Sequence, residues 1–381
     1  YIGVKKRFFV TFVLIGIAAT AFLSFIPEAY WFGMLVVYIL TAIGFSGANV
    51  FYDAFLVDIT PPERMDRVST TGFALGYIGS TIPFILCMAV VVSAQMEWLP
   101  LSIGAAFRIS FIITALWWGI FTLPLLKNVR QIHGIPIEPK PVAKSFRRIA
   151  GTFSNIKAHK HLFTFLVAYF FYIDGVDTII KMATSYGSDL GIDAMNLLVI
   201  LLATQFVAFP FALLYGRLAE RYGCKRMLFV GILTYTGICI YAYFLDSVLD
   251  FWILAMLVGT SQGGIQALSR SYFGKLVPKD QANEFFGFYN IFGKFAAIMG
   301  PFLVGFVTQM TGRTNNGVFS IILLFITGGI LLTRVPNAGE AKGAWLKNFI
   351  LISVFDHDFP EDFAVARRRV GDGIRAGLDG P

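Results

Sequence analysis

Long apolar runs alternate with short polar interruptions along most of the chain. Ten such runs stand out, and their approximate bounds are 8–25, 32–57, 68–94, 103–126, 161–185, 194–215, 227–245, 250–273, 284–308 and 317–334. Each is long enough to cross a hydrocarbon core about 30 Å thick. Only helices and closed barrels satisfy their backbone in lipid, and the alternating pattern of barrel strands is missing. The pattern therefore predicts an all-α integral membrane protein with ten transmembrane helices.

The composition narrows the class of protein further. Apolar residues make up 56% of the chain and charged residues only 14%, whereas a soluble domain carries about 25% charged residues. This excludes a water-soluble enzyme or a nucleic-acid-binding domain for most of the chain. The three cysteines predict neither a disulfide framework nor a metal pair. We expect no metal, no cofactor and no enzymatic activity.

Lys and Arg residues gather on one side of the predicted spans. Residues 1–7 and the loops 58–67, 127–160, 216–226 and 274–283 hold nineteen of them, and the loops on the other side hold only Arg313. Basic loops face the cytoplasm. We therefore expect a multi-pass protein of the plasma (inner) membrane with both termini cytoplasmic. The first run has no small-residue cleavage site, so it predicts a true span and not a signal peptide.

The chain also repeats itself at an offset of about 218 residues. The matching segments are 3–7 with 223–226, 58–64 with 275–280, and Pro83 with Pro301. A parallel repeat of a multi-helix unit is typical of a secondary transporter whose two halves surround a central site.

The two predicted halves are unequal. Residues 1–126 form a first half with four spans and residues 161–335 a second half with six, joined by a basic linker at 127–160 and followed by a polar cytoplasmic tail at 336–381. Shifted back by the repeat offset, the counterpart of the second half begins about 60 residues before Tyr1. We therefore expect two helices to be missing from the first half. The chain is then either a fragment of a longer transporter or a native ten-span protein.

Several segments resemble a known family. The stretch 216–226 is similar to the loop signature of the major facilitator superfamily, and residues 3–7 resemble the end of its first-half copy. Segments 49–59, 262–271 and 285–290 resemble the bacterial relatives of the autophagy-linked vacuolar amino-acid effluxers, a group within that superfamily. The resemblance covers all ten runs. It implies a two-half helical bundle, twelve spans in an intact protein, and transport by alternating access.

Charged residues inside apolar runs are costly in lipid and mark functional sites by default. Asp174, Asp177 and Lys181 share one helical face of run 161–185, and Asn290 shares a face of run 284–308 with Lys294. We predict a mid-membrane pair of Asp174 and Lys294 that takes part in proton coupling or binds the two ends of a zwitterion. The open alternative is structural, with Asp177 paired to Lys181 and Lys294 satisfied by backbone carbonyls.

Uncharged polar residues extend the candidate binding set. They are Gln262, Gln266, Asn49 and Tyr52. Each can exchange hydrogen bonds with a polar solute, although polar side chains also join helices to one another in lipid.

The basic loop at 216–226 is the candidate conformational gate. Its members are Gly216, Arg217, Arg221, Gly223, Lys225 and Arg226, with Asp53 and Asp58 serving the first-half copy. We expect these groups to bind helix C-termini or acidic residues in one conformation and to release them in the other. The alternative is that the basic residues only set the topology.

Together these features predict a secondary active transporter that moves a small polar solute by alternating access. Amino acids are favoured by analogy with the family, and proton coupling through Asp174 is a further hypothesis. The alternative is a non-transporting membrane module, such as a lipid scramblase or a regulatory membrane subunit. The expected partners are a small-molecule solute and membrane lipid, with no nucleic acid, and the chain is expected to be a monomer.

Overall fold

The computed structural model describes residues 3–27, 29–134 and 159–337, and over those residues it contains helices and turns but no strand. Ten of its helical segments are long and apolar enough to cross a membrane, which confirms the predicted all-α membrane fold. The first-half elements are α1 (Lys5–Leu23), α2 (Trp31–Ala54), α3 (Leu56–Ile59), the 3-10 turn η1 (Pro62–Arg64), α4 (Met65–Gln95) and α5 (Ile103–Asn128).

The second half supplies the remaining six spans. Its elements are α7 (Lys160–Asp189), α8 (Ala194–Tyr222), α9 (Cys224–Tyr243), α10 (Val248–Leu276), η3 (Lys279–Gln281), α11 (Ala282–Thr311), α12 (Thr314–Ser320) and α13 (Ile322–Thr333). The last span is thus two helices that meet at Ile321. Pro301 lies inside α11, where a proline lacks the N–H that the preceding turn would bind.

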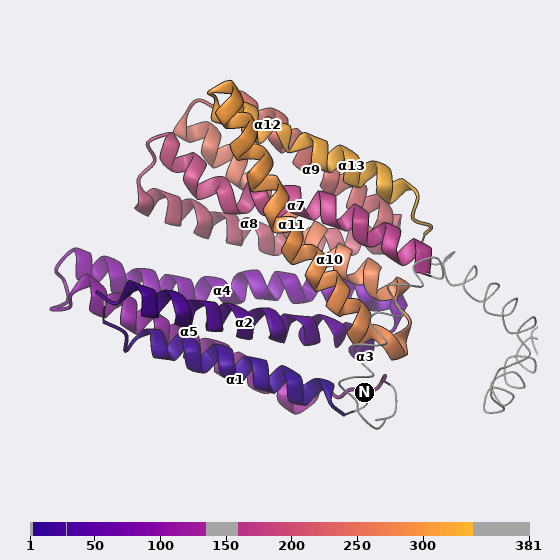
Figure 1. The fold of residues 1–381 in the computed structure, drawn as a ribbon, viewed down its shortest axis with the longest axis horizontal. Helices are drawn as coiled ribbons and strands as arrows, with labels where there is room; N and C mark the ends of the chain where they lie inside the picture. Colours follow the sequence, from indigo (N-terminus) through magenta and orange to yellow (C-terminus); the bar gives the residue numbers. More distant parts are fainter. Residues whose placement is uncertain (1–2, 28, 135–158, 338–381) are drawn as a thin grey trace, which may run out of the picture. The chain divides into compact units, whose positions relative to one another are not determined.

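Within residues 1–335 each half packs around its own core. In the first half α1 packs against α2 and α5, while α4 packs on α5 (Figure 1). Glycines allow the close crossing of α1 and α2, because a Cβ on Gly44 would lie 2.5 Å from the backbone nitrogen of Gly16. In the second half α7 packs against α11 and α13, and α10 packs against α8 and α9.

In each half, a lysine at the start of one helix donates hydrogen bonds to the carbonyl oxygens at the end of the last helix. Lys6, at the start of α1, donates to the carbonyl oxygens of Leu126 and Val129 at the end of α5. Lys225, at the start of α9, donates to the carbonyl oxygens of Thr333 and Val335 at the end of α13. A cation at a helix C-terminus is favourable because it neutralises unpaired carbonyls. This correspondence supports the internal repeat seen in the sequence.

Residues Tyr1–Val335 form one compact unit, and Pro336–Pro381 separate from it as another. Most of the predicted linker and nearly all of the predicted tail lie outside the described residues. The boundaries proposed for the linker and the tail therefore stay predictions.

Candidate functional site

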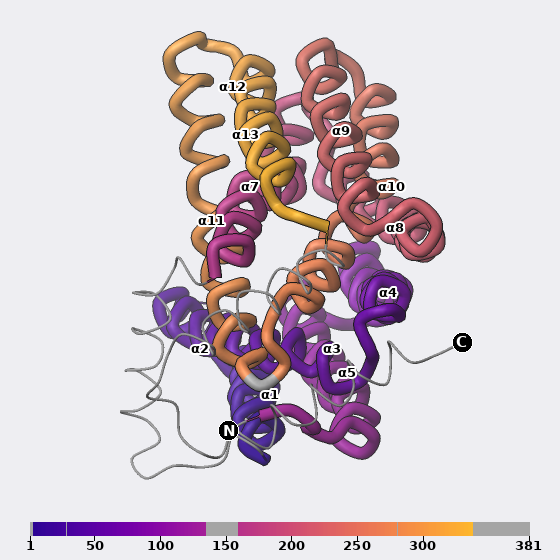
Figure 2. Tube along the Cα trace, turned by 90° about the vertical axis from the view of Figure 1, so that its right-hand side faces the viewer, coloured from indigo at the N-terminus to yellow at the C-terminus, as the bar shows by residue number. Residues whose placement is uncertain are grey.

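The halves are joined by polar contacts at one end of the bundle. We call this the basic end, formed by residues 3–7, 58–67, 216–226 and 274–283, and we call the end formed by 95–102, 186–193 and 309–316 the opposite end. Helix α4 packs on α8 and α10, while α2 packs on α11. Figure 2 shows the ends of α10 and α11 beside α2 and α3.

Arg270 of α10 is the centre of the first contact between the halves. Its guanidinium lies 3.2 Å from Oδ1 of Asp53 on α2, and it also donates to the hydroxyl and the carbonyl of Ser69 on α4. Asn290 of α11 donates to the other oxygen of Asp53 at 3.3 Å. Arg270 is only 5% exposed and lies over the rings of Tyr52 and Phe73. Four helices of the two halves, α2, α4, α10 and α11, thus converge on one buried ion pair.

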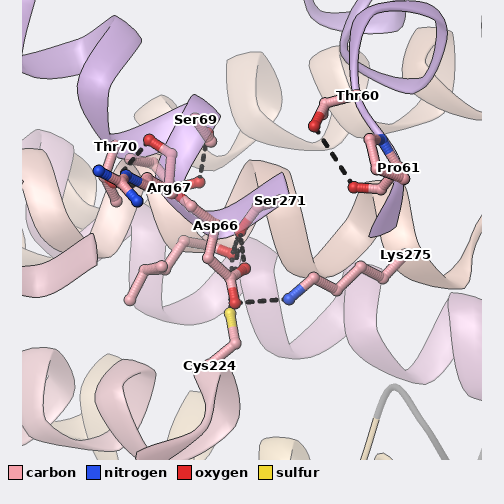
Figure 3. A network of polar contacts seen from close by, with 11 residues as sticks. Thr60, Pro61, Asp66, Arg67, Ser69, Thr70, Cys224, Ser271 and Lys275 are labelled. Atoms are coloured by element: carbon pink, nitrogen blue, oxygen red, sulfur yellow. Dashed lines mark hydrogen bonds and ion pairs between the residues drawn. The ribbon is translucent and has the colours of Figure 1, made fainter. Parts of the chain in front are cut away.

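Asp66 of α4 is the centre of the second contact (Figure 3). Its Oδ1 accepts from the Ser271 hydroxyl at 2.6 Å, and its Oδ2 lies 2.5 Å from the ammonium of Lys275. The hydroxyl of Ser69 donates to the carbonyl of Ala267 at 2.7 Å, one turn nearer the middle of the bundle. All of these bonds cross between the halves, so the basic end is closed in this structure.

The polar contacts between the halves reach the middle of the bundle and stop there. Tyr77 of α4 donates to Oε1 of Gln266 at 3.1 Å. Beyond Tyr77, toward the opposite end, no hydrogen bond joins α4 to the second half over the ranges that the structure describes. The polar contacts between the two halves are therefore confined to the part of the interface nearer the basic end.

The candidate loop at 216–226 contributes to this closure mainly through a glycine. A Cβ at Gly216 would lie 2.1 Å from the hydroxyl oxygen of Thr70, so α8 approaches α4 as closely as it does only because position 216 lacks a side chain. Gly223 has φ +93°, a conformation that favours glycine, and it links α8 to α9. Arg217 and Arg226 form no ion pair with an acidic residue in the part of the chain that the structure describes.

The other predicted gate residues act within one half. Asp58 is bound by Lys5 at 2.6 Å and by the backbone N–H groups of Ile132 and His133, so it joins α3 to α1 and to the residues after α5. Lys225 binds the end of α13, as described above. Arg221 lies over the ring of its neighbour Tyr222. Of the four basic residues in the loop, only Lys225 binds a helix end among the described residues, and of the two proposed gate acids only Asp53 bridges the halves there.

The predicted pair of Asp174 and Lys294 is not formed in this conformation. Asp174 is fully buried between α7 and α11, where its Oδ1 accepts from the Gly300 N–H at 2.9 Å and from Thr178 at 3.4 Å. Its other oxygen, Oδ2, has no hydrogen-bond partner among the described residues. The structural alternative holds in part, because the ammonium of Lys181 lies 3.8 Å from Asp177.

Lys294 lies exposed near the middle of α11. Its ammonium is 6.0 Å from the centre of the Phe45 ring on α2 and forms no ion pair with any residue that the structure describes. Asp53 of the first half and Asp177 of the second are both within its electrostatic range. An unpaired ammonium inside a membrane span is costly unless it meets water or an anion.

The uncharged candidates divide into two groups. Asn290 and Tyr52 belong to the surroundings of the Asp53–Arg270 pair, and Gln266 is engaged by Tyr77. Gln262 is buried in α10, and Asn49 is half-buried in α2.

Sequence reasoning missed five residues of the interface: Arg270, Asp66, Ser69, Ser271 and Lys275. One signal was present in the sequence. Arg270 lies 217 residues after Asp53, almost the repeat offset, so the two occupy matching positions of the two halves.

The chain matches one protein-family model and is similar to individual proteins of bacteria and fungi. Residues 1–342 match the family model described as "Vacuole effluxer Atg22 like". An uncharacterised MFS-type transporter of Bacillus subtilis, YxiO, is 60% identical over 337 residues, which are 88% of this chain and 79% of that protein. Autophagy-related protein 22 of Saccharomyces cerevisiae is 24% identical over 87% of this chain and 70% of its own length.

Solved structures share the fold. FucP, a major facilitator superfamily transporter in the outward conformation, superposes with a TM-score of 0.65 at 13% identity and covers 87% of this chain and 83% of its own. The proton:xylose symporter XylE superposes with a TM-score of 0.65 at 12% identity, covering 90% and 82%. At these identities the likeness shows the two-half transporter fold alone.

Proposed function

The chain belongs to the Atg22-like vacuole effluxer family of major facilitator transporters, and from this premise we propose that it moves a small zwitterionic solute by alternating access. The family resemblance favours amino acids as the substrate class. A coupling proton carried by Asp174 is part of the proposal.

The observation that carries the proposal is the unpaired ammonium of Lys294. It stands exposed at the middle of a span, with the carboxylate of Asp177 within electrostatic range on the adjoining helix α7. A solute with a carboxylate and an ammonium complements these two charges, with its carboxylate on Lys294 and its ammonium on Asp177. In this proposal Asp177, which lies 3.8 Å from the ammonium of Lys181, takes the place of the buried Asp174 as the anionic half of the binding site.

The basic end supplies the gate of the proposed cycle. We assign this end to the cytoplasm of a plasma membrane, because loops rich in Lys and Arg stay on that side. The closed contacts at Asp53–Arg270 and Asp66–Lys275 then belong to a state that is shut toward the cytoplasm. Transport requires these contacts to break when the solute is released inward.

The test is a thermal-stability measurement on the purified protein in detergent. Leucine is compared with 4-methylpentanoate, which lacks the amine, and with 3-methylbutylamine, which lacks the carboxylate. A ligand that binds only the folded state raises the stability by RT ln(1 + [L]/Kd), about 2.7 kcal/mol at a hundredfold excess over Kd. We expect stabilisation by the amino acid and little by either analogue.

Two variants make this test specific. Lys294→Gln is expected to abolish the stabilisation, whereas Lys279→Gln, which removes an exposed cation from the basic end, is expected to leave it intact. Equal stabilisation of the wild type and Lys294→Gln would remove Lys294 from the binding site. Stabilisation by the deaminated acid as strong as that by leucine would remove the requirement for a zwitterion.

A further inference from the structure

Asp174 is a buried acid with one free oxygen. It is 0% exposed, its Oδ1 is bonded to α11 and to Thr178, and its Oδ2 has no partner among the described residues. An unpaired carboxylate in such a place is costly, so the environment favours the neutral acid with its proton on Oδ2.

None of the basic side chains that the structure describes forms an ion pair with Asp174. On α7 the charges that act on Asp174 are those of Asp177 and Lys181, which have opposite signs. From α11 Asp174 meets the Gly300 N–H, and Lys294 of that helix acts on Asp177 instead. From α13 the Phe325 ring packs on Gly175, the residue next to Asp174. The same ring stacks on Tyr235 of α9. The hydroxyl of Tyr235 also lacks a hydrogen-bond partner among the described residues. On the α10 side Tyr172 is bonded to Ser269.

A cavity of about 390 Å³ opens between α7, α11 and α12 at the opposite end, and most of its lining surface is apolar. Its polar lining consists of Ser185, Asp189, Thr308, Gln309 and Thr314, together with the hydroxyl-bearing Tyr186. The hydroxyl oxygen of Thr308 is buried and has no hydrogen-bond partner among the described residues. These polar groups are the hydrogen-bond partners that the lining offers to water entering the cavity.

A second, smaller cavity with an almost entirely apolar lining adjoins the first, on the side of Asp174. Its volume is about 30 Å³, room for roughly one or two waters. It shares Met182, Tyr186, Val304 and Val318 with the larger cavity, and it reaches Thr178. The hydroxyl of Thr178 is the group that donates to Oδ1 of Asp174.

The residues of α7 between Asp174 and the opposite end that line or adjoin these cavities lie on one face of the helix. Asp174, Thr178, Met182, Ser185 and Asp189 follow one another at spacings of four, four, three and four, which is the repeat of a single helical face. One stripe of α7 therefore runs from the buried acid to the opposite end inside the second half.

We propose that Asp174 is a proton-binding site loaded from the opposite end through these two cavities, separately from the solute path between the halves. The inference rests on the proposed function, since it gives the coupling proton a route. A proton enters from water beside Asp189, passes through water in the smaller cavity, and binds Oδ2, converting the carboxylate to the neutral acid. Release is the reverse step, in a conformation that exposes Asp174 to the other side.

The experiment follows the protonation of Asp174 directly by infrared difference spectroscopy on the purified full chain after a drop in pH. The carbonyl stretch of a protonated carboxylic acid that is missing in Asp174→Asn identifies the group. Ser185→Trp places an indole in the larger cavity and is expected to slow the growth of this band roughly tenfold, equivalent to a barrier higher by about 1.4 kcal/mol. Ser188→Trp, an exposed position on the same helix outside the cavity lining, is the matched control.

Gln309→Trp fills the same cavity from α11 and serves if Ser185→Trp folds poorly. Unchanged rates in both cavity-filling variants would overturn the proposed route, and the lack of any band that Asp174→Asn removes would overturn the proton site itself. Neither result touches the stabilisation by leucine that depends on Lys294, so failure of the route and failure of the solute site are distinguishable.

Discussion

The guanidinium of Arg270 lies 3.2 Å from the carboxylate of Asp53, a residue 217 positions earlier in the chain. This separation matches the offset of the internal repeat within one residue. Helix α10, the second copy, thus meets α2, the first copy, at equivalent positions, and the residues there carry opposite charges. Both partners are largely withdrawn from water, which makes the pair sensitive to loss of either charge.

Removing the cation of this pair is expected to open the basic end. Arg270→Gln leaves Asp53 buried without its counter-charge, and breaking a buried pair in this way costs about 3–5 kcal/mol. The closed arrangement should therefore lose population. Spin labels at Arg67→Cys and Arg217→Cys, two exposed positions on α4 and α8, report the separation of the halves, and we expect Arg270→Gln to shift the distribution to longer distances.

The charge-exchanged protein is the control for this prediction. Asp53→Arg combined with Arg270→Asp restores opposite charges at the same two positions, so part of the closed population should return. A distance distribution in Arg270→Gln identical to that of the wild type would show that the ion pair does not hold the halves together.

A methyl group at position 216 is expected to weaken the same closure by steric means. The added Cβ would meet the Thr70 hydroxyl oxygen at 2.1 Å, so α8 and α4 have to move apart. Overpacking of this kind costs about 1–3 kcal/mol. Gly216→Ala should lower the melting temperature, and Gly237→Ala, where a Cβ meets nothing within 4 Å, should not. Adding Thr70→Ala to Gly216→Ala should recover stability, and a melting temperature unchanged by Gly216→Ala would contradict the close approach.

His159 is expected to make stability depend on pH. Burial against the Phe285 ring lowers the pKa of His159 below its ordinary value of 6.5, and Glu284 opposes the shift. The unfolded chain then binds more protons than the folded one, so stability is complete above pH 6.5 and falls as the pH drops below it. The melting temperature of His159→Phe should fall less between pH 7.5 and pH 5.5 than that of the wild type. Parallel curves for the two proteins would rule out this contribution.

Lys6 and Lys225, the two lysines that bind helix C-termini, should make equal and independent contributions to stability. Lys6→Ala and Lys225→Ala each remove a cation from a helix C-terminus, an interaction that contributes about 0.3–1 kcal/mol. Because the two sites are in different halves, the losses of unfolding free energy should add in the double variant. Urea unfolding of the four proteins tests this, with Lys225→Arg as the charge-preserving control. A loss confined to one half would count against equivalent roles.

The sequence predicted the ten spans because their apolar runs are long, but it placed several helix ends too far inward. Run 68–94 corresponds to α4 at Met65–Gln95, since polar residues such as Asp66 continue the helix beyond its apolar part. The repeat was likewise readable. The break at Ile321 between α12 and α13 was not, because apolar residues on both sides conceal it.

The polar contacts were harder to predict for a physical reason. Spacing along one helix identifies neighbours such as Asp177 and Lys181, which do interact. The partner of Asp174 depends on how α7 packs against α11, and that partner is a backbone N–H which no side-chain pattern reveals. Arg270 was overlooked as a site because it lies in an apolar run whose glutamines gave the stronger polar signal.

Locking the basic end tests the central claim of alternating access most directly. A Cβ at position 216 would lie 3.1 Å from the Cβ of Thr70, close to the roughly 3.5–4.5 Å that a disulfide spans. The measurement is leucine uptake into proteoliposomes by Thr70→Cys/Gly216→Cys, before and after reduction, with Thr70→Cys alone as control. The account predicts no uptake while the disulfide holds the halves closed and recovery on reduction. Undiminished uptake by the fully oxidised protein would contradict it.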